Sequence, residues 1–105
     1  MPGRQPKPPP RHWGTAEEWH SASLSQQAPP SAALAQGIAK RLHQALARNR
    51  ADNSGPGSAR KAAAASDLSI TTITNILKGT VWPDMDTIAR LEKALDADLW
   101  GEEHR

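Results

Sequence analysis

Apolar residues recur every three or four positions in three stretches of the chain, the spacing that places side chains on one buried face of an α-helix. These stretches cover residues 31 to 49, residues 70 to 78 and a segment that begins after Asp84 and ends at Asp96. Their apolar positions are, in order, Leu34, Ile38, Leu42 and Leu46, then Ile73, Ile76 and Leu77, then Met85, Ile88, Leu91 and Leu95. No stretch alternates apolar and polar residues as a half-buried strand does, so the sequence predicts an all-α domain.

The middle of the chain contains residue types that typically begin or end helices, and they divide it into short helical segments. Residues 59 to 65 are strong helix formers, and the break after them contains Asp67, which tolerates the left-handed conformation that ends a helix. Gly79 is expected to end the following helix, because glycine readily adopts the left-handed conformation. The predicted N-caps are Ser31, Ser58, Ser69 and Asp84. Residues 58 to 79 are therefore expected to form two short helices joined by a tight turn.

The second of these short helices has a polar outer side. Ile73, Ile76 and Leu77 share its buried side, which leaves Ile70, Thr71, Thr74 and Asn75 largely on the opposite side. Asparagine pairs with adenine in the major groove through two hydrogen bonds, and the methyl groups of threonine and isoleucine pack on the thymine methyl. This outer side is suited to contacting base edges.

Several of these features occur in one register. Ala63, Leu68 and Ser69, Ile73, Gly79, Pro83 and Leu95 keep the spacing of the Cro/repressor-like helix-turn-helix family, also called the XRE family, which the chain resembles from about residue 33 to 100. The resemblance implies a compact, lambda-repressor-like domain of four to five helices over residues 31–101. It also implies that helix 70–78 enters the major groove. Asp67 stands where the family usually has glycine, and Ala59 stands where it often has a phosphate-binding glutamine.

The sequence offers candidate residues for contacts to the bases and for contacts to the DNA backbone. The resemblance places base contacts at Ile70, Thr71, Thr74 and Asn75, with Thr71 and Asn75 first. Backbone contacts are expected from Arg60, Lys61, Ser69, Lys78, Thr80 and Trp82. For Trp82 the alternative is packing in its loop against Pro83 or the core.

The N-terminal region has a different composition. Seven of the nine prolines fall within residues 1–30, so we expect a disordered Pro-rich tail there and a frayed end at residues 102–105. The alternative is a docking segment, for a partner or for the domain itself, anchored by Trp13 and Trp19. Phosphate contacts from a flexible arm that carries Arg4, Lys7 and Arg11 are a further alternative.

Charge is distributed unevenly along the chain. Residues 31 to 80 carry seven basic and two acidic side chains, whereas residues 84 to 105 carry three basic and seven acidic ones. The low formal net charge of +2 hides this segregation. A basic cluster beside the predicted reading helix is what phosphate neutralisation needs. The alternative is that these cations merely solvate helix faces.

The sequence also lacks the patterns of several other classes of protein. There is no cysteine, no apolar run of membrane-spanning length and no apolar core of a signal peptide, so a cytoplasmic protein is expected. His12, His20, His43 and His104 have no metal-site spacing, and no phosphate loop or nucleophile motif occurs, so neither an enzyme, a metal nor a cofactor is expected.

The predicted function is a sequence-specific transcriptional regulator that binds double-stranded DNA. The fold suggests a homodimer, formed through the C-terminal helix, Leu99 and Trp100, or the tail. The alternative is an antitoxin or adaptor of the same fold that binds DNA weakly and docks a protein partner with residues 1–30.

Overall fold

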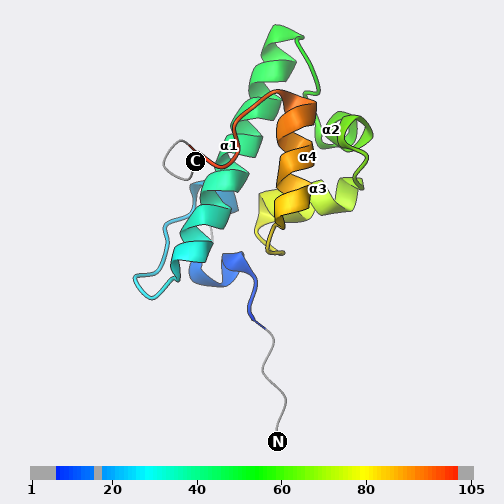
Figure 1. Cartoon of the computed structure of the whole chain (residues 1–105). Coiled ribbons are helices and arrows are strands. Elements are labelled where there is room, and N and C mark those ends of the chain that lie inside the picture. The colour runs from blue at the N-terminus through cyan, green and yellow to red at the C-terminus, as the bar shows by residue number, and fades with distance from the viewer. Residues whose placement is uncertain (1–6, 16–17, 102–105) are drawn as a thin grey trace, which may run out of the picture.

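The computed structural model describes residues 7–15 and 18–101 of the chain. Within these residues the chain forms four α-helices and two short 3-10 helices, and the predicted all-α class is confirmed. Its elements are η1 (Pro10–Trp13), η2 (Trp19–Ser21), α1 (Pro30–Asp52), α2 (Ala59–Ser66), α3 (Ile70–Lys78) and α4 (Met85–Leu95). The long helix α1 lies along one side of the molecule, and α2, α3 and α4 gather beside it (Figure 1).

Side-chain caps fix where the three shorter helices begin. Ser58 Oγ accepts a hydrogen bond from the Lys61 amide at 3.2 Å, and Ser69 Oγ accepts one from the Thr72 amide at 3.0 Å. Asp84 is the third cap, as its N-cap geometry in α4 shows. The predicted ends of α2 and α3 agree with the structure to within one residue, because capping depends on residues close in sequence.

The first long helix differs from its prediction at both ends. It begins at Pro30, with Pro29 as N-cap, rather than after a Ser31 cap. Proline suits the first helical position because the amide it lacks would have no helical partner there. The helix continues to Asp52 and ends where Asn53 adopts the left-handed conformation (φ 52°), so it extends beyond the predicted end at residue 49.

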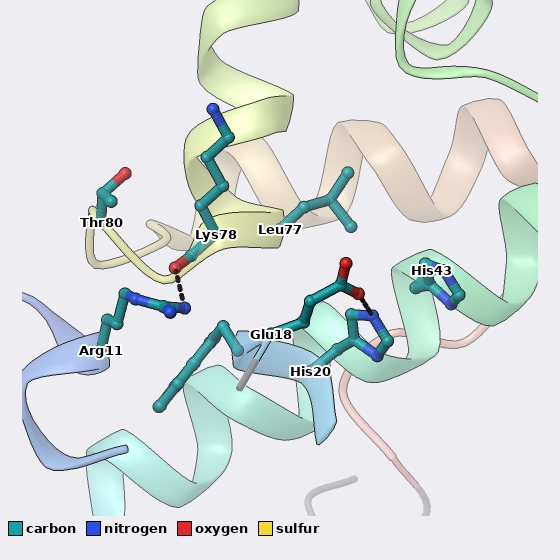
Figure 2. Close-up of a pocket in the computed structure, with 8 residues that line it drawn as sticks. Arg11, Glu18, His20, His43, Leu77, Lys78 and Thr80 are labelled. Carbon is teal, nitrogen blue, oxygen red and sulfur yellow. Dashed lines mark hydrogen bonds and ion pairs between the residues drawn. The ribbon is translucent and has the colours of Figure 1, made fainter. Parts of the chain in front are cut away.

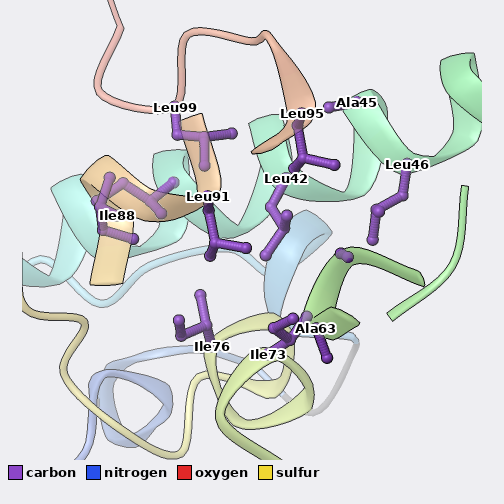
Figure 3. Packing of buried hydrophobic residues seen from close by; sticks show 12 residues of the cluster. Leu42, Ala45, Leu46, Ala63, Ile73, Ile76, Ile88, Leu91, Leu95 and Leu99 are labelled. Carbon is purple, nitrogen blue, oxygen red and sulfur yellow. The ribbon is translucent and has the colours of Figure 1, made fainter. Parts of the chain in front are cut away.

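The main core lies between α1 and the three shorter helices (Figure 3). Leu42, Ile73, Ile88, Leu91 and Leu99 are each completely buried, and they come from three helices and the segment after α4. Leu99 therefore belongs to the core, although it follows the last helix.

Met85 is a correction to the predicted stripe of α4, because its side chain is 76% exposed. Side chains on a helix lean toward its N-terminus, so a residue in the first position extends past the end of the core.

The N-terminal segment adds a second, smaller cluster. Trp19 is only 1% exposed and packs with Ala22, Ala35 and Ala39. The described residues of this segment, 7–15 and 18–30, therefore follow the alternative in which it docks on the domain itself, because burying the Trp19 indole removes a large apolar surface from water. Residues 1–6, 16, 17 and 102–105, including Arg4 and His104, lie outside the described residues.

Candidate nucleic-acid interface

The outer side of α3 has the arrangement that the sequence predicted. Ile73 and Ile76 are buried beneath the helix, while Thr71 is exposed and Ile70 keeps 39% of its surface exposed. Thr74 and Asn75 are half-buried. In the described chain the side chains of Thr71 and Asn75 make no hydrogen bond, so their polar groups are available to a partner.

Thr71 and Asn75 line a shared hollow of about 220 Å³. They are four residues apart and so lie one helical turn from each other. The opposite wall comes from the loop after α3 and from the start of α4. The remaining lining residues are Thr72, Ile76, Val81, Trp82, Pro83, Asp84 and Thr87.

Hydrogen bonds hold the Thr74 side chain and the C-terminal end of α3. Thr74 Oγ1 donates to the Thr71 carbonyl oxygen at 3.1 Å, so this hydroxyl is engaged within the helix. Thr80 donates to the Asn75 carbonyl oxygen from its amide at 3.0 Å and from its hydroxyl at 3.3 Å. The helix terminates at Gly79, whose φ of 75° is left-handed. The surface of α3 is therefore held at both of its ends.

The expected backbone-contact residues flank this surface. Arg60 and Lys61 are exposed in the first turn of α2, and Lys78 is exposed in the last turn of α3. None of the three forms an ion pair with any carboxylate among the described residues. Ser69 Oγ is engaged as the cap of α3 and also bonds Thr72 Oγ1 at 2.8 Å.

The Trp82 indole is engaged within the chain. Its Nε1 donates to the Pro8 carbonyl oxygen at 2.9 Å, and its ring lies 6.0 Å from the Trp13 ring. Lys7 Nζ lies 3.9 Å from the Trp82 ring centroid, a cation–π contact. A partner could use the Trp82 N–H only by displacing Pro8. Packing in the loop, the alternative for this residue, thus takes place with the N-terminal segment.

The N-terminal segment also reaches the C-terminal end of α3. The Arg11 amide donates to the Gly79 carbonyl oxygen at 2.9 Å, and Arg11 Nη1 donates to the Lys78 carbonyl oxygen at 3.5 Å. Figure 2 shows Arg11 below the turn that carries Lys78 and Thr80. These three residues line a cavity of about 600 Å³, together with Glu18, Trp19, His20, His43 and Leu77. The sequence predicted Lys7 and Arg11 as a flexible arm and gave no local signal for this fixed position.

Asp84 is a titratable group whose pKa is lowered by its surroundings. The Thr87 amide donates to Asp84 Oδ1 at 2.8 Å. The hydrogen bonds from the Thr87 backbone, then from its hydroxyl, hold the pKa of Asp84 below its usual value. The ionised carboxylate therefore caps α4.

The described residues lack two features that would indicate other functions. Within residues 7–15 and 18–101 no group of three or more histidine, aspartate or glutamate side chains is arranged to hold a metal ion. In the same part of the chain no helix has both the length and the apolar character needed to cross a membrane.

Residues 57–99 match a family model described as "Helix-turn-helix". The matched region begins just before α2 and ends after α4, so it contains the surface described above. Neither a curated protein nor a solved structure matches the chain.

Proposed function

We propose that this chain is a sequence-specific regulator that binds double-stranded DNA. It carries a helix-turn-helix domain of the Cro/repressor-like (XRE) family. The observation that carries this proposal is the outer side of α3, where Thr71 and Asn75 present unpaired polar groups on a helix anchored in the core. A major groove about 12 Å wide admits such a helix.

The base contacts follow from the chemistry of four side chains. The Asn75 amide offers a donor and an acceptor that match the major-groove edge of adenine. Thr71 offers a hydroxyl and a methyl group, Ile70 offers only apolar contact with a thymine methyl, and Thr74 keeps its methyl group and acceptor capacity. Asn75 and Thr71 are the main candidates because no described group competes for them.

The phosphate contacts come from around α3. Arg60, Lys61 and Lys78 supply charge, Thr80 supplies a hydroxyl, and Ser69 acts mainly by holding the start of α3. Trp82 contributes through its position in the wall of the hollow, since its N–H is occupied by Pro8.

A domain of this size contacts few base pairs, so we propose that two copies bind two half-sites about 34 Å apart. Leu99 is fully buried and is therefore not available to a second copy. Exposed Met85 at the start of α4 and half-buried Trp100 remain available for such a contact. A regulator of this kind acts in the compartment that holds the DNA, and we propose that this compartment is the cytoplasm.

The adaptor alternative would use the N-terminal tryptophans as anchors for a protein partner. Burial of Trp19 and the contact of Trp13 with Trp82 support the regulator instead, because both indoles are already used within the chain. A protein partner would have to displace these contacts.

Selection from a random duplex-DNA library at near-physiological salt tests the proposed function. The full chain should enrich one motif, arranged as two half-sites one helical turn apart. An unenriched library, together with binding that does not depend on sequence, would contradict the proposal.

A further inference from the structure

We propose that Trp13 is a positioning residue for base recognition, because it holds the Trp82 indole as a fixed wall beside Asn75. Trp13 itself touches no base and acts through Trp82. This inference rests on the proposed function and extends it to the N-terminal segment, which lies outside the matched residues 57–99.

The Trp82 indole is where the N-terminal segment meets the base-contacting side of α3. It lines the hollow of about 220 Å³ that also contains Thr71 and Asn75. It also packs against the smaller apolar cluster, to which the N-terminal segment contributes Trp19 and Ala22. The position of this ring therefore depends on the N-terminal segment, and the same ring shapes the hollow.

Residues 7–13 hold the Trp82 ring through a hydrogen bond, a ring contact and a cation–π contact. Trp82 Nε1 donates to the Pro8 carbonyl oxygen at 2.9 Å. The Trp13 ring lies 6.0 Å from the Trp82 ring between centroids and is tilted by 58°, within the range in which aromatic pairs attract each other. Lys7 Nζ lies 3.9 Å from the Trp82 ring centroid. Together these contacts restrain both the edge and the face of the indole.

The backbone around Trp13 is itself anchored to the rest of the chain. The Trp13 carbonyl oxygen accepts a hydrogen bond from the Ser25 amide at 2.8 Å. Two residues earlier, the Arg11 amide donates to the Gly79 carbonyl oxygen at 2.9 Å. Trp13 therefore has a defined position, from which its ring supports Trp82.

A fixed wall matters because of the way Asn75 distinguishes bases. Its amide pairs with adenine through two hydrogen bonds, and hydrogen bonds weaken steeply when their angles are distorted. Asn75 is half-buried, so the walls of the hollow limit the orientations in which a base reaches its amide. A Trp82 ring that moved would admit more orientations. Support of Trp82 therefore raises discrimination at this base more than it raises overall affinity.

The test measures base discrimination with the full chain. The wild type and Trp13→Ala are titrated with the selected duplex and with duplexes that differ from it at one base pair. At the position that depends on Asn75, Trp13→Ala should lose about fivefold in discrimination, the lower end of what one base contact contributes. Positions that neither Asn75→Ala nor Thr71→Ala affects should keep theirs. The slope of log K against log salt should also stay unchanged, because no phosphate contact is removed.

Two further variants separate positioning from a general loss of packing. Trp13→Phe keeps an aromatic ring against Trp82 and should retain most of the discrimination. Leu24→Ala is the matched control, because Leu24 is half-buried against the same smaller cluster but contributes none of the three contacts that hold Trp82. It should lower stability without changing discrimination. Thermal unfolding gives a temperature at which all the variants are folded, and binding is measured there.

A double-mutant cycle identifies the residue through which Trp13 acts. In the Asn75→Ala background, Trp13→Ala should have no further effect at the same base position, because the contact that it supports is already absent. A residue that merely stabilises the fold would give a loss in both backgrounds.

Three results overturn the inference: unchanged discrimination in Trp13→Ala, an equal loss at every base pair, or a loss that adds to that of Asn75→Ala. If Trp13→Ala does not fold, Trp82→Phe replaces it, because this variant keeps a ring in the wall but cannot donate to Pro8. It should lose discrimination at the same position, and wild-type discrimination would overturn the inference. A wild type that selects no motif contradicts the proposed function itself, whereas a selected motif that Trp13→Ala leaves unchanged contradicts only this inference.

Discussion

At the scale of single residues, Gly79 joins the end of α3 to the N-terminal segment. Its φ of 75° lies in the region that favours glycine, and its amide bonds the Asn75 and Ile76 carbonyl oxygens to end the helix. The same absence of a side chain admits the Trp19 ring. The left-handed backbone and the packing of the Trp19 ring therefore both favour glycine at position 79.

Gly79→Ala should destabilise the fold by about 1–3 kcal/mol, because alanine strains the left-handed backbone and its methyl group displaces Trp19. Urea unfolding measures the change. Gly55→Ala is the matched control, since an added Cβ there first meets the Asn49 side chain at 3.3 Å and the backbone is not left-handed. Equal losses for the two variants would contradict this account.

At the scale of elements, each of the α-helices α2, α3 and α4 begins at a side-chain cap. The cap of α4 is also the group with a lowered pKa, since the bonds from Thr87 favour ionised Asp84. A pKa lower in the folded state stabilises the fold above the unfolded pKa of about 3.9, and this contribution disappears as the pH falls through the folded value.

Asp84→Asn should flatten the loss of stability on acidification below about pH 4, because asparagine still caps the helix but does not titrate there. The measurement is the midpoint of thermal unfolding from pH 7 down to pH 2.5. Asp52→Asn, an exposed aspartate at the end of α1, is the control and should keep the wild-type profile. An Asp84→Asn profile that follows the wild type would exclude this role of the carboxylate.

The elements also show how far local sequence determines structure. The ends of α3 could be predicted because Ser69 and Gly79 act on residues three or four positions away. The predicted start of α1 at Ser31 is wrong, because the helix begins at Pro30, within the region whose composition predicts a tail. Met85 has the spacing of the core stripe, but its place in the first turn leaves it exposed. Periodicity alone does not show where the core ends.

At the scale of the whole molecule, the described N-terminal residues form a layer that packs on both α1 and α3. Trp19 is its largest fully buried side chain, and Gln36 Nε2 donates a hydrogen bond to the Trp19 carbonyl oxygen at 3.0 Å. Composition could not predict this layer, because the layer depends on the contact between Trp19 and Gly79. These two residues are far apart in sequence, and no local pattern around either one indicates the contact. The positions of Lys7 and Arg11 follow from that contact and were missed for the same reason.

Trp19→Ala should cost about 3–5 kcal/mol and release the N-terminal layer. Trp19→Phe should cost clearly less, because it keeps a ring on Gly79 and removes Nε1, a buried N–H that has no hydrogen-bond partner among the described residues. Chemical denaturation gives both values, and proteolysis within residues 18–30 reports release of the layer. Similar small costs for the two variants would show that Trp19 does not hold the segment.

The central claim is that α3 contacts base edges through Thr71 and Asn75, and library selection with single variants tests it most directly. The wild type, Thr71→Ala, Asn75→Ala and the exposed α1 control Gln44→Ala are each selected against the same random duplexes. Asn75→Ala should lose about 1–3 kcal/mol of discrimination at one base position, Thr71→Ala should lose discrimination at a neighbouring position, and Gln44→Ala should enrich the wild-type motif. An identical motif from all four proteins would contradict the assignment of α3 as the base-contacting helix.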